Sequence, residues 1–172
     1  MKRWKKSYKE GKETEVLFRK LAEVRGYEVF PSPPHININN HIDYYLYKNG
    51  KTISVDIKSG KKINRSNLYA QEEWVWIELK NVKGQRGWLY GDAIYIAFEI
   101  EEGFFIVKRK QLENLVENLI ENTYVSKAED AKYKKYTRVG REDILTLMTL
   151  KDFKENLTNE IWIKEKPLIP KD

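Results

Sequence analysis

Two carboxylates and a lysine in the first third of the chain have the types and spacing of a metal-dependent hydrolytic site. Asp56 and Lys58 are two residues apart in an alternating segment, so on a strand they share one face, opposite Ile57. Asp43 lies in the preceding alternating segment. Adjacent carboxylates repel each other and are stabilised by a hard divalent cation, while a neighbouring lysine can position a water or stabilise charge developing on a phosphate. These residue types suit metal-assisted hydrolysis of a phosphodiester bond.

A β-hairpin is predicted to bring the two aspartates together. The alternating segments 41–47 and 51–58 flank Asn49-Gly50, and both residues of this pair tolerate the positive φ angles that a tight hairpin turn requires. Antiparallel pairing of the segments then places Asp43 alongside Asp56. The sequence therefore predicts a two-carboxylate site with a lysine at one end of a hairpin.

A third carboxylate is predicted on a helix that precedes the hairpin. Apolar residues recur at helical spacing over residues 14–25, and Gly26 ends the pattern. Glu15 on this helix could reach the aspartates, with Glu13 as the alternative. Glu15 is also four residues from Arg19, so a surface ion pair with that arginine is an equally good interpretation.

Three other residues are secondary candidates. In a second register of the motif, Asp56 is the first acid, and Glu78 and Lys80 supply the second acid and the lysine. The first register is preferred because the Asn-Gly turn puts Asp43 beside Asp56 without a long excursion. Glu78 could still approach the metal from a neighbouring strand. His41 could polarise a water or contact a phosphate, or it is an exposed histidine near the start of a strand.

The order of a helix with Glu, a hairpin with Asp and a strand ending in Asp-x-Lys resembles the PD-(D/E)xK nuclease superfamily, over roughly residues 11–107. Asp43 is similar to the first acid of that superfamily, and Asp56, Ile57 and Lys58 are similar to its tripeptide. Phage-type members also carry a later strand with an acid, a glycine-rich loop and an Ala-Asp-Tyr-like strand. Similar segments here are residues 77–81, 84–88 and 92–95.

The resemblance implies a restriction-endonuclease-like core and a nuclease that depends on Mg²⁺ or Mn²⁺. Asp43 and Asp56 would bind the metal ion, with a backbone carbonyl near Ile57 as a third ligand. Glu15 would tune the site or bind a second ion, and Lys58 would position the attacking water. Two other interpretations stay open: a structure-selective Holliday-junction resolvase of the same superfamily, and a non-catalytic nucleic-acid-binding module on the same fold.

Composition narrows both the class of protein and the kind of metal. The chain has 172 residues, which suits a single domain over residues 1–172. It has no Cys, which excludes disulfides, Cys-ligated zinc and thiol nucleophiles, and its two histidines are too few for a three-His metal centre. Oxygen ligands, and so Mg²⁺ or Mn²⁺, are expected. No apolar run approaches the ~20 residues of a membrane helix, and the basic start resembles no secretory signal, so we expect a cytoplasmic protein without membrane contact.

The balance of charges favours a nucleic-acid partner, and we expect DNA rather than RNA. Lys and Arg total 32 against 26 Asp and Glu, a formal charge of +6, and six of the first twelve residues are basic. Residues 1–12 are predicted to form a mobile or surface-lying basic arm. A homodimer is left open. The candidate phosphate-binding residues are Lys61, Lys62, Arg65, Arg86, Lys134 and Lys135. Aromatic rings could also stack on unpaired bases, and the candidates are Trp74, Trp76 and Trp88. For at least two of them, packing under a helix is the expected role.

The remaining patterns predict an α/β (α+β) fold with a mixed central sheet and flanking helices. Residues 13–107 would form the nuclease core, and residues 108–172 would add C-terminal helices and a basic segment. Further strands are expected at residues 27–30, 74–80, 93–98, 104–107 and 144–148, further helices at residues 110–121 and after the capping residue Thr149, and irregular segments at residues 31–34, 59–72 and 81–91.

Overall fold

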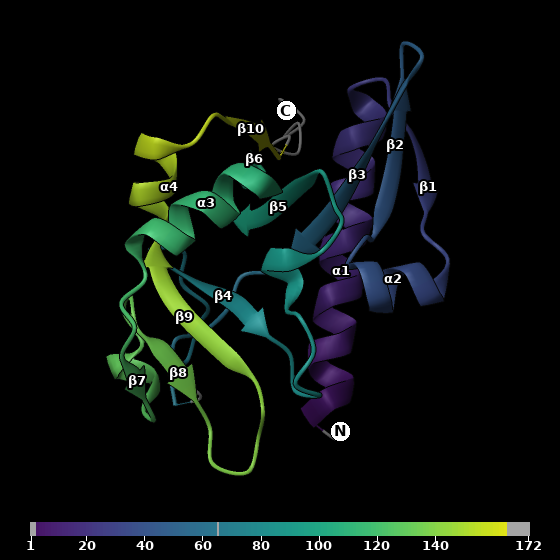
Figure 1. The fold of residues 1–172 in the computed structure, drawn as a ribbon. Coiled ribbons are helices and arrows are strands. Elements are labelled where there is room, and N and C mark those ends of the chain that lie inside the picture. The colour runs from purple at the N-terminus through teal and green to yellow at the C-terminus, as the bar shows by residue number, and fades with distance from the viewer. Residues whose placement is uncertain (1–2, 65, 165–172) are drawn as a thin grey trace, which may run out of the picture.

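The computed structural model describes residues 3–64 and 66–164, with only the backbone described for residues 3–9. Six strands form one mixed sheet in the order β1-β2-β3-β5-β6-β10, and four form a second sheet in the order β4-β9-β8-β7 (Figure 1). The elements are α1 (Arg3–Val24), β1 (Glu28–Pro31), α2 (Pro34–Asn40), β2 (Tyr44–Lys48), β3 (Lys51–Lys58), β4 (Trp74–Lys80), the 3-10 turn η1 (Trp88–Tyr90), β5 (Tyr95–Ile100), β6 (Gly103–Lys108), α3 (Arg109–Leu119), β7 (Tyr124–Val125), the 3-10 turn η2 (Ala128–Asp130), β8 (Lys135–Thr137), β9 (Ile144–Thr149), α4 (Leu150–Asn156) and β10 (Asn159–Ile163).

Helix α1 covers one face of the six-stranded sheet. Its side chains Phe18 and Leu21 are buried with Val55 and Ile57 of β3. Phe18 also stacks on Trp162 of the edge strand β10, with ring centroids 5.1 Å apart. The N-terminal half of α1 continues past the carboxyl end of β3 (Figure 1). Residues near the middle of α1 are therefore level with the end of the strand that carries Asp56.

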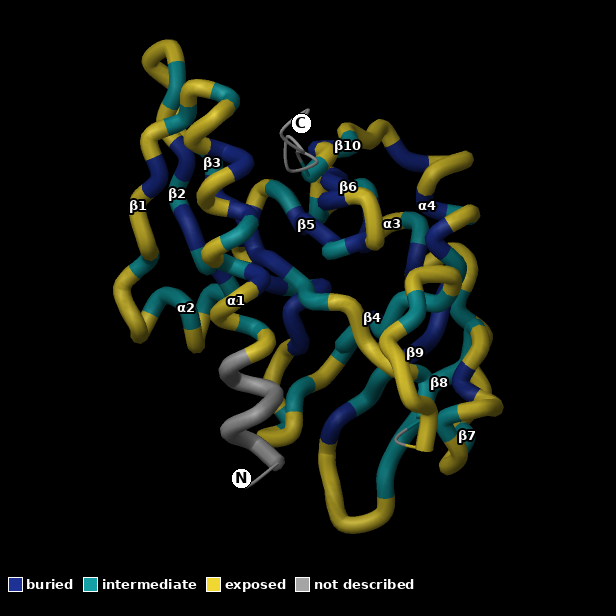
Figure 2. Tube along the Cα trace, turned by 180° about the vertical axis from the view of Figure 1, so that it is seen from behind, coloured by how far each residue is buried: buried dark blue, intermediate teal, exposed yellow. Residues whose placement is uncertain are grey.

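The opposite face of this sheet packs on the second sheet and on the two C-terminal helices. Ile96 and Phe98 of β5 share a buried cluster with Ile77 of β4 and Met148 of β9. Phe153 of α4 belongs to the same cluster. Figure 2 shows this buried interior running through the strands, with exposed loops around it. Because β4 lies in the second sheet, it faces the first sheet instead of pairing beside β3.

Several local predictions are confirmed. The hairpin of β2 and β3 turns at Asn49 and Gly50, whose φ angles are 50° and 74°, and β3 pairs parallel with the buried strand β5. Thr149 caps α4, because its Oγ1 accepts a hydrogen bond of 3.1 Å from the Asp152 backbone N–H. The fold class is a mixture of helices and mixed sheets, as expected.

Two expectations about the architecture are corrected. A single central sheet was expected, but β4 pairs antiparallel with β9, more than sixty residues later, and so belongs to a second sheet. Residues 3–12 form the first turns of α1 instead of an arm, since no proline interrupts them and a helix extends readily once its C-terminal half is packed.

The elements that were not expected include α2, which follows Pro33 with a proline at its first position, β10, which pairs with β6, and the short strands β7 and β8. Among the described residues, no helix combines the length and the apolar character needed to cross a membrane.

The tight contact between β6 and β10 leads to a prediction about stability. A Cβ on Gly103 would lie 1.8 Å from the Trp162 carbonyl oxygen, and the φ of Gly103 is +157°. We expect Gly103→Ala to lower the free energy of unfolding by about 3 kcal/mol, through strain and overpacking. Gly11→Ala is the matched control, because a Cβ there meets nothing within 4 Å and alanine favours a helix by about 0.5–1 kcal/mol. Urea denaturation measures both, and equal midpoints for the two variants would contradict the expectation.

Candidate functional site

The β2–β3 hairpin holds the Asp43 carboxylate against the strand that carries Asp56. The Asp43 backbone N–H donates to the Val55 carbonyl at 2.9 Å, directly before the paired residues Tyr44 and Val55, and so holds Asp43 beside the part of β3 that carries Asp56. The Asp43 Oδ2 accepts a hydrogen bond of 2.7 Å from the Ile57 backbone N–H, and its Oδ1 accepts one of 2.7 Å from Asn37 Nδ2. The Asp43 side chain is therefore oriented from both sides.

Asp56 is a buried carboxyl with one oxygen that has no partner. The residue is 3% exposed, and its Oδ1 lies 2.8 Å from the Lys58 Nζ, whereas no hydrogen-bond partner contacts Oδ2. Burial raises the pKa of Asp56, the Lys58 ammonium opposes this shift without cancelling it, and the nearby Asp43 carboxylate adds to it, so that the pKa is about 8. Near neutral pH this carboxyl therefore holds a proton unless another cation replaces it.

The Lys58 ammonium is a positive charge that affects the pKa of groups on several elements. Its Nζ lies 5.0 Å from the centroid of the Trp88 ring in η1. Its charge opposes the rise in the pKa of Glu15 on α1 and of Glu78 on β4, and it adds to the lowering of the pKa of His41 after α2. The fold thus gathers groups from α1, the end of α2, β3 and β4 around one lysine.

Glu15 lies at this site and is not paired with Arg19. Its Oε2 is 2.9 Å from the Lys12 Nζ, and Arg19 instead pairs with Glu23 at 2.8 Å. Burial raises the pKa of Glu15, Asp43 raises it further, and Lys12 opposes both effects. The carboxylate on α1 therefore stands close enough to Asp43 to repel it.

His41 has an unusual backbone conformation beside the site. It ends α2 with φ 54° and ψ 52°, in the left-handed region that non-glycine residues rarely adopt. Desolvation lowers the pKa of His41, the Lys58 charge lowers it further, and a hydrogen bond to the backbone of Arg86 opposes both. Its imidazole is therefore neutral at neutral pH and available to hydrogen-bond a water or a substrate oxygen.

Glu78 reaches the site from the second sheet, and Lys80 does not. Burial raises the pKa of Glu78, and its Oε1 accepts a hydrogen bond of 3.3 Å from the Trp88 backbone N–H. The expectation that Glu78 lies on a strand next to β3 is wrong, because β3 pairs with β2 and β5. Lys80 is exposed after a bulge in β4 and is not among the residues that line the pocket beside Lys58. The geometry therefore groups Lys58, not Lys80, with the two aspartates.

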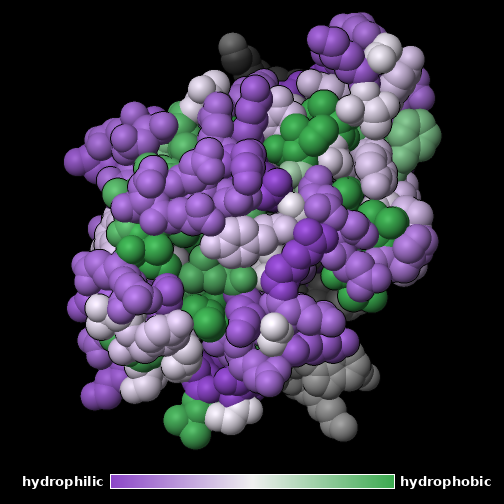
Figure 3. All heavy atoms as spheres, viewed as in Figure 1, coloured by the Kyte–Doolittle hydropathy of each residue, from purple (hydrophilic) through white to green (hydrophobic). Residues whose placement is uncertain are grey.

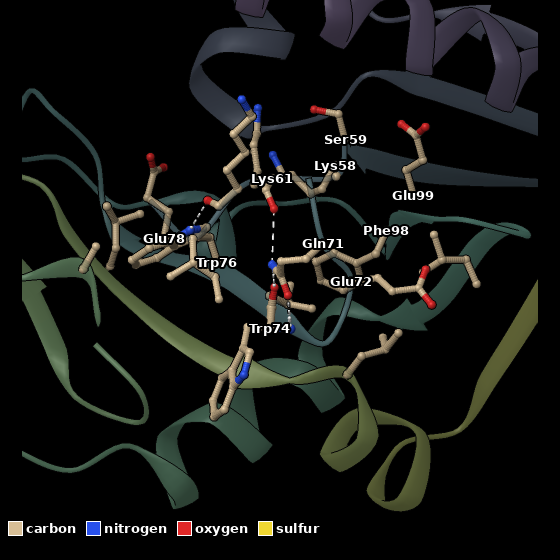
Figure 4. Close-up of a pocket in the computed structure, with 18 of the residues that line it drawn as sticks. Lys58, Ser59, Lys61, Gln71, Glu72, Trp74, Trp76, Glu78, Phe98 and Glu99 are labelled. Carbon is tan, nitrogen blue, oxygen red and sulfur yellow. Dashed lines mark hydrogen bonds between the residues drawn. The ribbon is translucent and has the colours of Figure 1, made fainter. Parts of the chain in front are cut away.

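A pocket of about 850 Å³ opens beside Lys58, between the two sheets. Figure 4 shows Trp74, Trp76 and Glu78 of β4 on one side and Lys58 on the other. Residues 59–64 and 71–72 form a third wall, held by an isolated bridge between Lys61 and Gln71. On the face of the molecule seen in Figure 3, hydrophilic side chains cover most of the surface, with apolar side chains in small patches.

The predicted phosphate-binding residues are dispersed. Lys61 and Lys62 line the pocket, and desolvation together with the Lys58 charge lowers the pKa of Lys61, although much of its side chain is exposed. Arg86 lies outside the pocket lining and pairs with Asp92 at 2.9 Å. Lys134 precedes β8 and Lys135 begins it, two strands away from β4 in the second sheet, and the Lys135 Nζ contacts Asn122. Arg65 lies outside the described residues. Among the described candidates, the two lysines after β3 are thus the ones that line the pocket beside the candidate site.

Two groups near the site were not predicted. Asp143 is 2% exposed and forms an ion pair with Arg138, while its Oδ1 has no partner. Both charges affect the pKa of Glu78. The sequence carries no signal that this pair lies near Glu78, because that position depends on β9 pairing with β4. Asn37 was also missed, because no helix was expected at residues 34–40.

The donors present fit a hard divalent cation. Within residues 3–64 and 66–164, no three His, Asp or Glu side chains already form a ligand cluster. Mg²⁺ does not require one, because it usually keeps several waters and binds one or two carboxylates together with substrate phosphates. Asp43 and Asp56 supply two such carboxylates, and the unpartnered Oδ2 of Asp56 is a buried oxygen that a cation would satisfy.

Comparison with known proteins gives no relative from which to transfer a function. No protein-family model matches the chain, and no curated protein or solved structure matches it either. The function is therefore argued from the site itself.

Proposed function

We propose that the protein is a Mg²⁺- or Mn²⁺-dependent nuclease that hydrolyses phosphodiester bonds in DNA. The observation that carries the proposal is the buried Asp56 carboxyl, with one oxygen on Lys58, the other without a partner, and Asp43 beside it. Two carboxylates that must share a proton or a cation, next to an ammonium, are suited to binding a divalent ion and a phosphate together. DNA is the substrate that the resemblance to the nuclease superfamily implies.

The roles of the residues follow from their contacts. Asp43 and Asp56 bind the ion, and Asn37 and the Ile57 backbone N–H keep the Asp43 carboxylate in place. A bound divalent ion lowers the pKa of its water and offsets negative charge on the phosphate. Asp56 would hold the ion as a carboxylate, and Lys58, whose Nζ lies 2.8 Å from the Asp56 Oδ1, would position the attacking water or hold a phosphate oxygen.

Glu15 and His41 contribute at the margin of this site. The Glu15 carboxylate repels Asp43, so a cation bound between them would relieve this repulsion. Glu15 could also hold a second ion. The neutral His41 imidazole can accept or donate a hydrogen bond to a water without adding charge. Neither group is required to bind the first ion.

A cleavage assay tests the proposal directly. Linear duplex, single-stranded and four-way-junction DNA are incubated with the protein in MnCl₂ or in EDTA. We expect cleavage only with the metal, a loss of at least about 100-fold in Asp43→Asn, and wild-type rates in Asp130→Asn, which changes an exposed carboxylate on η2.

The alternatives give different results in the same assay. Cleavage confined to the junction would identify a resolvase. Binding without cleavage of any substrate would overturn the nuclease and leave a nucleic-acid-binding module. Cleavage that persists in EDTA would overturn the metal-dependent mechanism.

A further inference from the structure

The pocket beside Lys58 has an aromatic wall that the hydrolytic site does not use. Trp88 is buried and packs edge-on against Phe98, so its role is structural. Trp74 is covered by Tyr133 at 6.0 Å between centroids and by the Lys132 Nζ at 4.5 Å. Trp76, by contrast, is half-buried and lines the pocket. Of the three tryptophans considered, it is the one best placed to meet a ligand.

The orientation of the Trp76 ring is fixed before any ligand binds. Its Nε1 donates a hydrogen bond of 3.0 Å to the Lys62 carbonyl, and its ring is tilted by 40° against Tyr136, with centroids 5.5 Å apart. The loop that accepts this bond is held in turn, because the Gln71 Nε2 donates to the Trp74 carbonyl at 2.6 Å. The wall is therefore a preorganised platform, which reduces the entropy lost on binding.

The charged groups around the platform suit a phosphodiester chain that runs past the aromatic wall. The cations that line the pocket are Lys58, Lys61, Lys62 and Arg138, and the carboxylates are Glu72, Glu78 and Glu99. Arg138 is anchored by its ion pair with Asp143, and its Nε has no partner. Lys58 belongs both to this lining and to the hydrolytic site, so a strand bound in the pocket continues directly to the scissile phosphate.

We propose that this pocket binds one or two unpaired nucleotides of the DNA strand that is cut, with a base stacked on Trp76. This inference rests on the proposed nuclease function and specifies its substrate as DNA with a single-stranded segment beside the scissile bond. The volume of about 850 Å³ lies within the roughly 300–1,000 Å³ of pockets that hold one small ligand. A paired base is stacked within its duplex, so only an unpaired base can offer its face to the ring.

The test measures binding without catalysis. A dye-labelled oligothymidine of twelve nucleotides is titrated with the full chain in EDTA and followed by fluorescence anisotropy, with a blunt DNA hairpin as the competing ligand. We expect the oligothymidine to bind more tightly than the hairpin. Trp76→Leu keeps an apolar side chain and should weaken oligothymidine binding by about 5- to 100-fold, and Trp76→Phe should restore most of it. Tyr47→Ala removes a partly exposed aromatic ring from the distant end of the hairpin and should bind like wild type.

The outcomes separate this inference from the proposed function. Equal affinity of wild type and Trp76→Leu for the oligothymidine, with both variants folded by circular dichroism, would overturn the stacking platform even if metal-dependent cleavage is observed. Tighter binding of the blunt hairpin would also overturn it. Trp76-dependent binding in a protein that cleaves no DNA would support the platform and overturn the nuclease.

Discussion

Asp56→Asn is expected to abolish cleavage and to remove the stabilisation by metal, while making the metal-free protein more stable. Asparagine resembles the protonated carboxyl in shape, and it can still accept a hydrogen bond from Lys58 and donate one toward Asp43. It cannot bind a divalent cation as a carboxylate does. We expect cleavage to fall by about 1,000-fold or more, because the metal supplies several kcal/mol of charge stabilisation.

The pH dependence of stability gives this variant a specific signature. The pKa of Asp56 is about 8 in the folded chain and near 3.8 when it is exposed. The unfolded state therefore loses this proton first as pH rises. The stability that wild type gains from the protonated Asp56 is fully present below about pH 4 and is lost progressively up to about pH 8. In EDTA, the Asn variant should become more stable than wild type by about 1.4 kcal/mol for each pH unit between about 5 and 7.

Urea denaturation at several pH values, in EDTA and in MnCl₂, measures both effects. At a Mn²⁺ concentration 100 times the dissociation constant, wild type should gain about 2.7 kcal/mol, and Asp56→Asn should gain none. Taking the difference between the two proteins cancels the contributions of other shifted groups such as Glu15 and Glu78. Asp130→Asn serves as the surface control and should follow wild type. An Asn variant that is stabilised by Mn²⁺ as much as wild type would show that Asp56 is not a metal ligand.

Lys58→Met is expected to slow cleavage by about 100- to 1,000-fold while leaving metal binding intact. A protonated lysine has no lone pair for a cation, so its loss does not remove a ligand. Methionine keeps the apolar part of the contact with the Trp88 ring, whose centroid lies 5.0 Å from the Lys58 Nζ. The ammonium matters most as negative charge builds on the phosphate, and removing such a donor typically costs this factor in rate.

Single-turnover cleavage and metal titration calorimetry distinguish the two parts of this expectation. Mn²⁺ should bind Lys58→Met at least as tightly as wild type, since a competing cation has been removed from Asp56. Lys80→Met is the matched control, because Lys80 is exposed on β4 and lies outside the pocket lining. If Lys80→Met is inactive and Lys58→Met cleaves at the wild-type rate, the catalytic lysine is Lys80 and the second register of the motif is correct.

The parts of the candidate site that lie within one hairpin could be predicted from sequence. Asn49-Gly50 determines the turn, and antiparallel pairing of the two strands then brings Asp43 beside the part of β3 that carries Asp56. Glu15 could also be predicted as a site residue, because its helix is amphipathic and directly precedes the first strand. The ion-pair partner of Glu15 could not be predicted, because both Lys12 and Arg19 are within reach of Glu15 along the helix. Only the packed structure selects Lys12.

The sequence by itself determined the elements whose signals are local: the hairpin, the buried strand β5, the helix α3 and the capped helix α4. The tertiary structure decided that β4 joins a second sheet with β9, that β10 completes the first sheet, and that a pocket opens between them beside Lys58. It also decided that Glu78, and not Lys80, faces that lysine. Periodicity and turn residues report the conformation of a segment and which of its faces is apolar. They do not report which distant segment that face will meet, because strands with similar apolar faces compete for the same partners and only the packing of the whole chain selects among them.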